Sequence, residues 1–158
     1  IYNVGANIKF SILETTSKKY QKVWEMATFG AFLIGREVAK KMVPRKKGTL
    51  IFTGATASIR GGDGFSAFAG AKNAKRALAQ SMARELGPKG IHVAHIIIDG
   101  AIDTPWINAT FPDFAKEKKK QDGLMKPDDI AKNYLWIHKQ QKNSWTHELD
   151  LRPWNEKW

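Results

Sequence analysis

Apolar residues recur every three or four positions over three stretches of the chain, and this spacing predicts three amphipathic helices. The first spans Tyr20 to Met42, follows N-cap candidates at residues 15–17 and ends at Pro44. The second spans about residues 65–86 and is rich in alanine, and the third spans residues 127–139. Each predicted helix has one apolar face, so each must pack against another layer of the fold.

Short apolar runs between these helices predict β-strands. Residues 50–52 form one such run, and residues 91–98 form another that is nearly all apolar and β-branched. A run this continuous is typical of a strand covered on both faces, as in a parallel sheet. Residues 145–151 alternate in polarity and predict a final strand, whereas residues 105–120 are amphipathic but irregular.

The alternation of strands and helices predicts an α/β fold with a doubly wound parallel sheet built from right-handed βαβ units. Residues 2–5 are typical of the end of a buried strand that runs into a glycine turn. We therefore interpret residues 1–158 as the C-terminal part of one domain, whose first strands are expected upstream of Ile1.

The charge and composition narrow the possible partners. The chain carries 26 Lys and Arg against 15 Asp and Glu, a formal net charge of +11, and no cysteine. The basic residues are scattered over helix ends and polar helix faces, which favours a solvated surface over a nucleic-acid site. No apolar run approaches the roughly 18 residues of a membrane span. We expect a cytoplasmic protein with neither membrane nor nucleic acid among its partners.

Four short motifs follow one another along the chain. They are Asn3-Val4-Gly5, the strand run at residues 48–52, Phe-Ala-Gly-Ala-Lys at residues 68–72, and Asp-Gly-Ala-Ile-Asp-Thr at residues 99–104. Their order and spacing resemble the C-terminal portion of the short-chain dehydrogenase/reductase family. That family has an Asn-Asn-Ala-Gly turn, its fifth strand, a Tyr-x-x-x-Lys motif and a Pro-Gly-x-x-x-Thr turn at these places. The resemblance implies a Rossmann-like sheet, whose glycine-rich dinucleotide fingerprint has no counterpart in this sequence.

The resemblance implies an oxidoreductase that uses NAD or NADP on a small carbonyl or alcohol substrate. In this family a Tyr hydroxyl is the general acid/base, and a Lys four residues later lowers its pKa and holds the nicotinamide ribose. A Ser polarises the carbonyl, and an Asn positions a relay water. The resemblance also implies a substrate contact from Trp106 and cofactor contacts from Asn3, Gly5, Lys72, Gly100, Ile102 and Thr104.

Three of the four catalytic positions are substituted in this chain. Phe68 stands at the Tyr position, Ala55 at the Ser position and Ala27 at the Asn position, whereas Lys72 is retained. A phenyl ring has no proton to give to a substrate oxygen. We therefore expect turnover to be weak or absent. The alternative is a non-catalytic cofactor-binding or assembly module of the same fold.

Other side chains near these positions could act as substitute acids. Asp99 replaces the family's Pro and is a tentative catalytic acid if burial raises its pKa, or else a turn residue bonded to its own backbone. The hydroxyls of Thr56, Ser58 and Ser66 lie nearby in sequence, but unassisted aliphatic hydroxyls are poor acids near neutral pH.

The histidines and tryptophans favour packing over chemistry. His92 and His95, three residues apart on a strand, face opposite sides of the sheet and are expected to be packed, so no metal site is predicted. His147 and Glu148 are expected to be exposed, and either paired across strands or at a subunit contact. Trp24 is expected in the core. A homodimer or homotetramer is expected, with contacts from Trp136, Trp145, Trp154, Trp158, Ala67, Ala71, Ala74 and Ala77.

Overall fold

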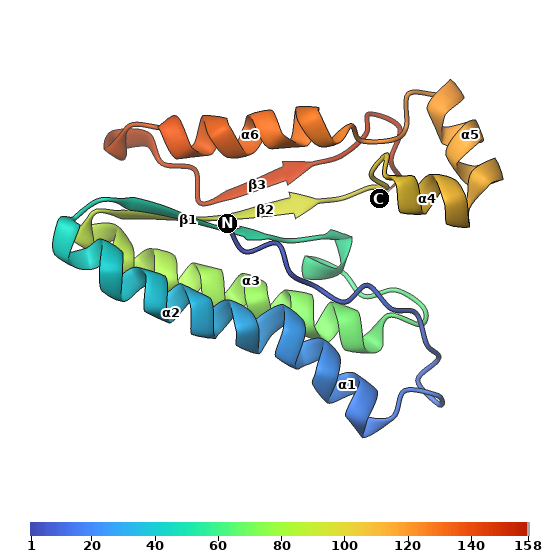
Figure 1. Cartoon of the computed structure of the whole chain (residues 1–158), viewed down its shortest axis with the longest axis horizontal. Helices are drawn as coiled ribbons and strands as arrows, with labels where there is room; N and C mark the ends of the chain where they lie inside the picture. The colour runs from blue at the N-terminus through green and yellow to red at the C-terminus, as the bar shows by residue number, and fades with distance from the viewer. Residues whose placement is uncertain (158) are drawn as a thin grey trace.

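The computed structural model describes residues 1–157. Trp158, which we expected at a subunit contact, lies outside the described residues. Strands and helices follow one another from an irregular N-terminal segment (Figure 1). The elements are α1 (Ser17–Trp24), α2 (Gly30–Met42), β1 (Gly48–Thr53), α3 (Ser66–Leu86), β2 (Ile91–Ile98), α4 (Pro105–Thr110), α5 (Pro112–Lys120), α6 (Pro127–Lys139) and β3 (Glu148–Leu151).

The sheet is parallel, with the strand order β1-β2-β3. Tyr2 adds a parallel bridge to Phe52, so the N-terminal segment lies along the free edge of β1. Every residue of β2 is buried, as the continuous apolar run predicted. The α/β class and the parallel sheet are confirmed.

Alternate residues of each strand face different helical layers. Leu50, Phe52 and Val93 pack with residues of α2 and α3. Ile51 and Ile96 pack on the opposite face with residues of α6. Figure 1 shows the same arrangement, with α1, α2 and α3 below the sheet and α6 above it. The sheet is therefore the middle of three layers.

The two helical crossovers have opposite hands. The steps from β1 to β2 and from β2 to β3 run in the same direction across the sheet, yet α3 and α6 lie on opposite faces. Parallel connections of this kind cannot both be right-handed. Our expectation of right-handed units throughout is therefore wrong for one crossover. The long segment between residues 99 and 126 carries the chain to the other face before α6 begins.

The long first helix is divided by a π-helical turn at Glu25–Phe29. Its start agrees with the sequence, because the Thr16 side chain accepts a hydrogen bond from the backbone of Lys19. Trp24 does not lie in the core as expected: it is 39% exposed and stacks on Phe29. The π turn adds a residue to the helical repeat, and this shift changes which side chains face the sheet.

Two other regions differ from the sequence prediction. The irregular stretch at residues 105–120 contains two short helices, α4 and α5, each with proline in its first turn. The last strand begins at Glu148, because Trp145 instead stacks flat on His92 with ring centroids 4.8 Å apart. The boundaries of α6 agree with the prediction.

Candidate active site

The four sequence motifs converge at the carboxyl edge of the sheet. The Tyr2 backbone pairs with Ile51 and Thr53, which places Asn3–Gly5 beside the end of β1. The backbone N–H of Gly54 donates to Ile96 O over 2.6 Å, which fixes the turn after β1 against β2. Ligands of open α/β sheets bind beyond this edge.

Lys72 reaches this edge from α3. Its side chain is buried, at 6% exposure, and its Nζ donates to the carbonyl oxygen of Thr53 over 3.2 Å. A Cβ placed on Gly5 would lie 3.3 Å from this Nζ, so the glycine leaves room for the amine. Burial lowers the pKa of Lys72, and a hydrogen bond with Lys75 acts in the opposite direction.

Phe68 lies one helical turn before Lys72 and offers only a hydrocarbon face. Its ring is buried beside Ala27, Ala57 and Ala71. The Lys72 Nζ lies 5.4 Å from the centre of the ring. Within residues 1–157, the side chains at the predicted Tyr and Lys positions are therefore close together, without a hydroxyl between them.

The positions expected to hold Ser and Asn are also apolar. Ala55 is half-buried, and its backbone N–H donates to Ser58 Oγ over 3.1 Å. Ala27 is fully buried in the π turn. The Ser66 Oγ is buried, with no hydrogen-bond partner among the described residues. Ser58 is thus used to hold the turn after β1.

Asp99 is an ion-pair residue. Its carboxylate is 1% exposed, accepts from Thr56 Oγ1 over 2.5 Å and accepts from both terminal nitrogens of Arg60 over 3.2 Å. The guanidinium of Arg152 lies 3.6 Å away. The interpretation as a turn residue bonded to its own backbone is wrong, since these partners come from distant segments. The role of Asp99 as an acid stays a prediction, and the Thr56 hydroxyl is already engaged.

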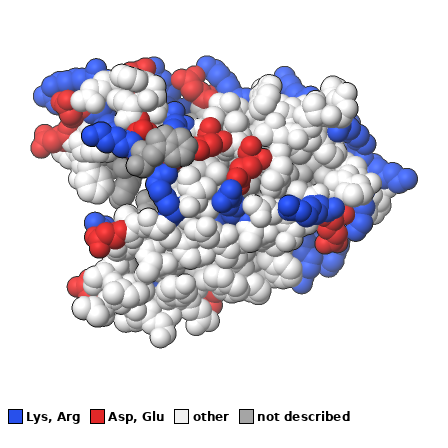
Figure 2. All heavy atoms as spheres, turned by 180° about the vertical axis from the view of Figure 1, so that it is seen from behind, with Lys and Arg blue, Asp and Glu red and all other residues white. Residues whose placement is uncertain are grey.

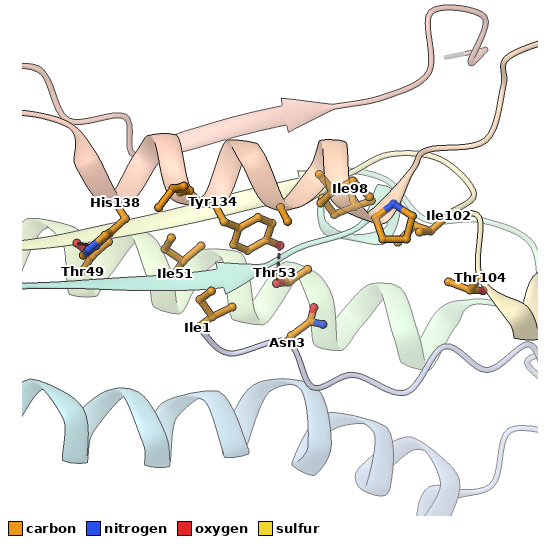
Figure 3. A pocket seen from close by; sticks show the side chains of 14 residues that line it. Ile1, Asn3, Thr49, Ile51, Thr53, Ile98, Ile102, Thr104, Tyr134 and His138 are labelled. Atoms are coloured by element: carbon orange, nitrogen blue, oxygen red, sulfur yellow. Dashed lines mark hydrogen bonds between the residues drawn. The ribbon is translucent and has the colours of Figure 1, made fainter.

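An apolar groove of about 660 Å³ opens on the α6 face of this edge (Figure 3). Asn3, Ile102 and Thr104 line it, whereas Gly5, Lys72 and Gly100 are not part of its wall. The Thr104 side chain also caps α4 by accepting from Ile107 N. The site residues predicted from sequence therefore divide between the groove and the buried edge.

Trp106 is not part of the groove wall. It is 58% exposed and meets Phe111 edge-on at 5.7 Å, on the outer surface of α4. Pro105 starts α4, so Trp106 belongs to the first turn of this helix. Its side chain is therefore not carried by a loop that could cover the groove. Its substrate contact stays a prediction.

Two polar side chains at the candidate site were missed at the sequence level. The Tyr134 hydroxyl lies 2.7 Å from Thr53 Oγ1 inside the groove, and burial raises the pKa of this tyrosine. Tyr134 falls on the apolar stripe of α6 with Ile130 and Ile137, which was the available signal. Lys75 lies three residues after Lys72 and is fully buried, although its charge suggested a solvated residue.

The histidines serve packing and ion pairing. His95 Nδ1 lies 2.9 Å from Glu148 Oε2, and Glu148 also accepts two hydrogen bonds from Arg76. Burial lowers the pKa of His95 to about 4. His147 and Glu148 are half-buried, so their expected exposure is wrong. Their expected pairing across strands is confirmed, because His147 Nδ1 lies 3.1 Å from Val93 O and Glu148 contacts His95, both on β2. Within residues 1–157, no three His, Asp or Glu side chains gather in a metal-binding group.

Comparison with known proteins identifies the family. The family model described as short chain dehydrogenase matches residues 1–114. A curated relative, the (21S)-21-acetoxyl-apo-melianone synthase of Melia azedarach, is 36% identical over 135 residues, which cover 80% of this chain and 49% of the relative. The chain belongs to the short-chain dehydrogenase family, and it spans about half the length of this relative.

Solved structures agree on the fold. A short-chain dehydrogenase from Rhodopseudomonas palustris superposes with a TM-score of 0.77 at 47% identity, covering 96% of this chain and 60% of that one. 4-Hydroxyisoleucine dehydrogenase, solved with NADH, gives a TM-score of 0.81 at 22% identity, covering 98% and 67%. The Rossmann-like architecture is thus shown. In the described chain, no helix is long and apolar enough to cross a membrane.

Proposed function

We propose that this chain is part of an oxidoreductase that uses NAD or NADP, and that its reduction of small carbonyl substrates is weak or absent. Family membership supports the reaction class. One observation supports the low activity: Phe68, a buried hydrocarbon ring, occupies the position of the proton-donating tyrosine beside the retained Lys72.

The residues at the carboxyl edge fit the nicotinamide end of such a cofactor. The groove is largely apolar with a few polar groups, including Asn3 and Thr104, which is typical of cofactor sites. Lys72 supplies a buried amine. Gly5 lies next to this amine and has no side chain, so it leaves space beside the Nζ atom. When bound, NAD(P) supplies or accepts the hydride. Asn3, Lys72 and Thr104 would hold its ribose and amide, with Gly5, Gly100 and Ile102 as close neighbours.

Among the described residues, the position predicted to hold the proton-donating tyrosine has no hydroxyl. Two nearby hydroxyls have partners: Thr56 donates its proton to Asp99, and the Tyr134 hydroxyl pairs with Thr53 Oγ1. General acid catalysis contributes a factor of about 10² to 10⁴. Loss of the Tyr hydroxyl should therefore reduce turnover by a factor of that order, even with cofactor and substrate bound.

The test is to restore the missing groups in the full-length protein. Phe68→Tyr places a hydroxyl one helical turn from Lys72, and Ala55→Ser adds the carbonyl partner. Cofactor oxidation is measured with a panel of small ketones and quinones for each single variant and the double variant. We expect both single variants to raise turnover, and the double variant to exceed the product of the two gains if both hydroxyls contact one oxygen.

Phe65→Tyr is the matched control, because Phe65 neighbours Phe68 at 6.4 Å but does not occupy the Tyr position. It should leave turnover unchanged. Robust wild-type turnover that Phe68→Tyr lowers or leaves unchanged would refute the proposal, and Asp99 would then be the first acid to mutate.

A non-catalytic assembly module is the second candidate, favoured by exposed aromatic residues on the helical layer. Trp24, Phe29 and Phe32 form a stacked row with successive centroids 5.7 and 6.1 Å apart, and each is more than a third exposed. Seen from behind, a broad area in the lower part of the molecule carries few charges (Figure 2). Exposed aromatic side chains of this kind suit a homodimer or homotetramer.

This candidate has its own measurement. Sedimentation of the full-length protein should show an oligomer that Phe29→Asp dissociates, with cofactor binding but no turnover. Of the other residues expected at a subunit contact, Ala67 and Ala71 are buried within the chain, so they contact α1 and its neighbours instead.

A further inference from the structure

Two lysines one turn apart on α3 are buried together behind the candidate site. Lys72 is 6% exposed and Lys75 is fully buried. Lys72 Nζ donates to Thr53 O over 3.2 Å, and Lys75 Nζ donates to Val4 O over 3.4 Å. Thr53 ends β1 and Val4 follows the neighbouring bridge of Tyr2. The two amines therefore hold adjacent chain segments at the carboxyl edge.

Neither amine has a carboxylate partner in the described part of the chain. The ion pairs among residues 1–157 include neither Lys72 nor Lys75. Glu148 of β3 accepts from Arg76, the residue after Lys75, and also contacts His95. Two buried ammonium groups without an anion are costly, because each must give up its hydration and the like charges repel.

The other groups around Lys75 cannot offset its charge. The ring of Tyr2 lies 5.6 Å from its Nζ, and the Tyr2 hydroxyl donates to Met26 O. The charge of Lys75 also helps to lower the pKa of His95 of β2, and a histidine is not an anion that could neutralise an ammonium group. A cation–π contact is worth about 2 kcal/mol when desolvated, which is less than the several kcal/mol that a buried ion costs.

We propose that Lys75 is a positioning residue for Lys72: the two amines carry one charge between them, with neutral Lys75 accepting a hydrogen bond from the Lys72 ammonium. This pair would replace the family's Tyr–Lys couple as the titratable centre of the edge. The pairing follows from the packing of α3 on the two chain segments. Its meaning for catalysis rests on the proposed function.

The electrostatics agree with this arrangement. Burial, the charge of Lys72 and the hydrogen bond with Lys72 together lower the pKa of Lys75 to about 6. Near neutral pH Lys75 is therefore largely uncharged. Its hydrogen bond with Lys72 favours the ammonium form of Lys72, against the effect of burial, which lowers the pKa of Lys72.

The test is a lysine titration in the full-length protein, with 13C and 15N in the lysine side chains and NMR detection from pH 5 to 11. Lys75→Met and Lys72→Met assign the two signals. In the wild type we expect one lysine signal to titrate near pH 6 and to vanish in Lys75→Met. In that variant the midpoint of Lys72 should fall by at least one pH unit, because the hydrogen bond that its ammonium makes with neutral Lys75 is lost.

Lys41→Met is the control, since Lys41 is an exposed lysine on α2. It should leave the titration of Lys72 unchanged. If Lys75→Met does not fold, Lys75→Gln, which keeps a polar end group, replaces it. The wild-type titration needs neither variant, because it already shows whether a lysine titrates near pH 6. Titration of every wild-type lysine above pH 9, or an unmoved Lys72 midpoint, would overturn the proposal.

The titration does not depend on turnover. Absence of any reductase activity would count against the proposed function and leave the charge pairing intact. If every lysine titrated above pH 9 while Phe68→Tyr raised turnover, the charge pairing would be refuted and the proposed function would be supported.

Discussion

The two faces of the sheet differ in how fully this chain covers them. On the α2 and α3 face, Phe52 and Val93 lie in a closed apolar core, and polar side chains such as Lys75 and His95 are sealed in beside it. On the α6 face, Ile51 and Thr53 border an open apolar groove of about 660 Å³. Neighbouring residues of one strand thus meet two different environments.

The two faces therefore differ in how many of their side chains are accessible. The closed face holds Phe68 and Lys72, at the predicted Tyr and Lys positions, and both side chains are buried. The open groove carries several of the polar side chains that remain accessible, including Asn3, Thr104 and His138. Under the proposed function, a bound cofactor would use these accessible groups of the groove.

Adjacent core substitutions in β1 give the largest expected effect. Phe52→Ala removes a fully buried ring from the closed face and should cost about 3–5 kcal/mol of unfolding free energy. Ile51→Ala should cost about 2 kcal/mol, the lower end for such changes, because the side chain borders existing space. Urea unfolding of the full-length protein measures both. Equal costs would show that the groove is filled by packed protein.

The ion pairs of Asp99 give the next largest effect. Asp99→Ala leaves Arg60 and Arg152 without this carboxylate, and Thr56 without its acceptor. Arg60 is about a third exposed, so we expect about 2–3 kcal/mol, below the 3–5 kcal/mol typical of broken buried pairs. Asp63→Ala, at a fully exposed aspartate, is the control and should cost almost nothing. An equally small cost for Asp99→Ala would contradict this assignment.

Periodicity predicted the elements because burial follows it. The continuous apolar run at residues 91–98 is β2, buried throughout, and Pro127 starts α6 as expected. The hand of the crossovers was not predictable, since it depends on how the segment between residues 99 and 126 crosses the strand ends. The π turn at Glu25–Phe29 was equally hidden, because it changes the helical repeat without any proline or glycine inside it.

The candidate site was predictable only where a side chain's place follows from a motif. The motif containing Phe68 and Lys72 is indeed at the carboxyl edge of the sheet. Lys75 was missed because a lysine is ordinarily solvated, and its burial depends on a backbone carbonyl, Val4 O, that is 71 residues away in sequence. The partners of Asp99 are likewise distant in sequence, so the prediction of a turn residue bonded to its own backbone was wrong.

Lys75 should also make stability depend on pH. Its pKa is about 6 in the folded chain and near its ordinary value of 10.5 when unfolded, so between these values the unfolded state binds more protons. Stability should therefore rise with pH across this window, and the burial cost is fully present below pH 6. The slope is on the order of 1 kcal/mol per pH unit.

The measurement compares wild type with Lys75→Met from about pH 8 to pH 9.5, a range in which His95 is neutral in both the folded and the unfolded state. The difference in unfolding free energy should change by about 2 kcal/mol in favour of the wild type as the pH rises. A constant difference would mean that Lys75 keeps its ordinary pKa, and the closed face would then hold two charged amines.

The smallest effect concerns cofactor binding, which tests whether the closed face contributes to ligand binding at all. Lys72→Ala in the full-length protein should weaken NAD(P) binding by at least tenfold, roughly 1.4 kcal/mol, because the amine expected to hold the ribose is lost. Lys41→Ala, at an exposed lysine of α2, should leave Kd unchanged. Thermal unfolding separates this role from a structural one. A structural role would lower Tm, because the variant loses the buried side chain and its hydrogen bond to Thr53 O, whereas weaker binding with an unreduced Tm indicates a lost ligand contact. An unchanged Kd would mean that Lys72 has only a structural role, its hydrogen bond to Thr53 O. The cofactor site would then lie wholly on the groove side of the sheet.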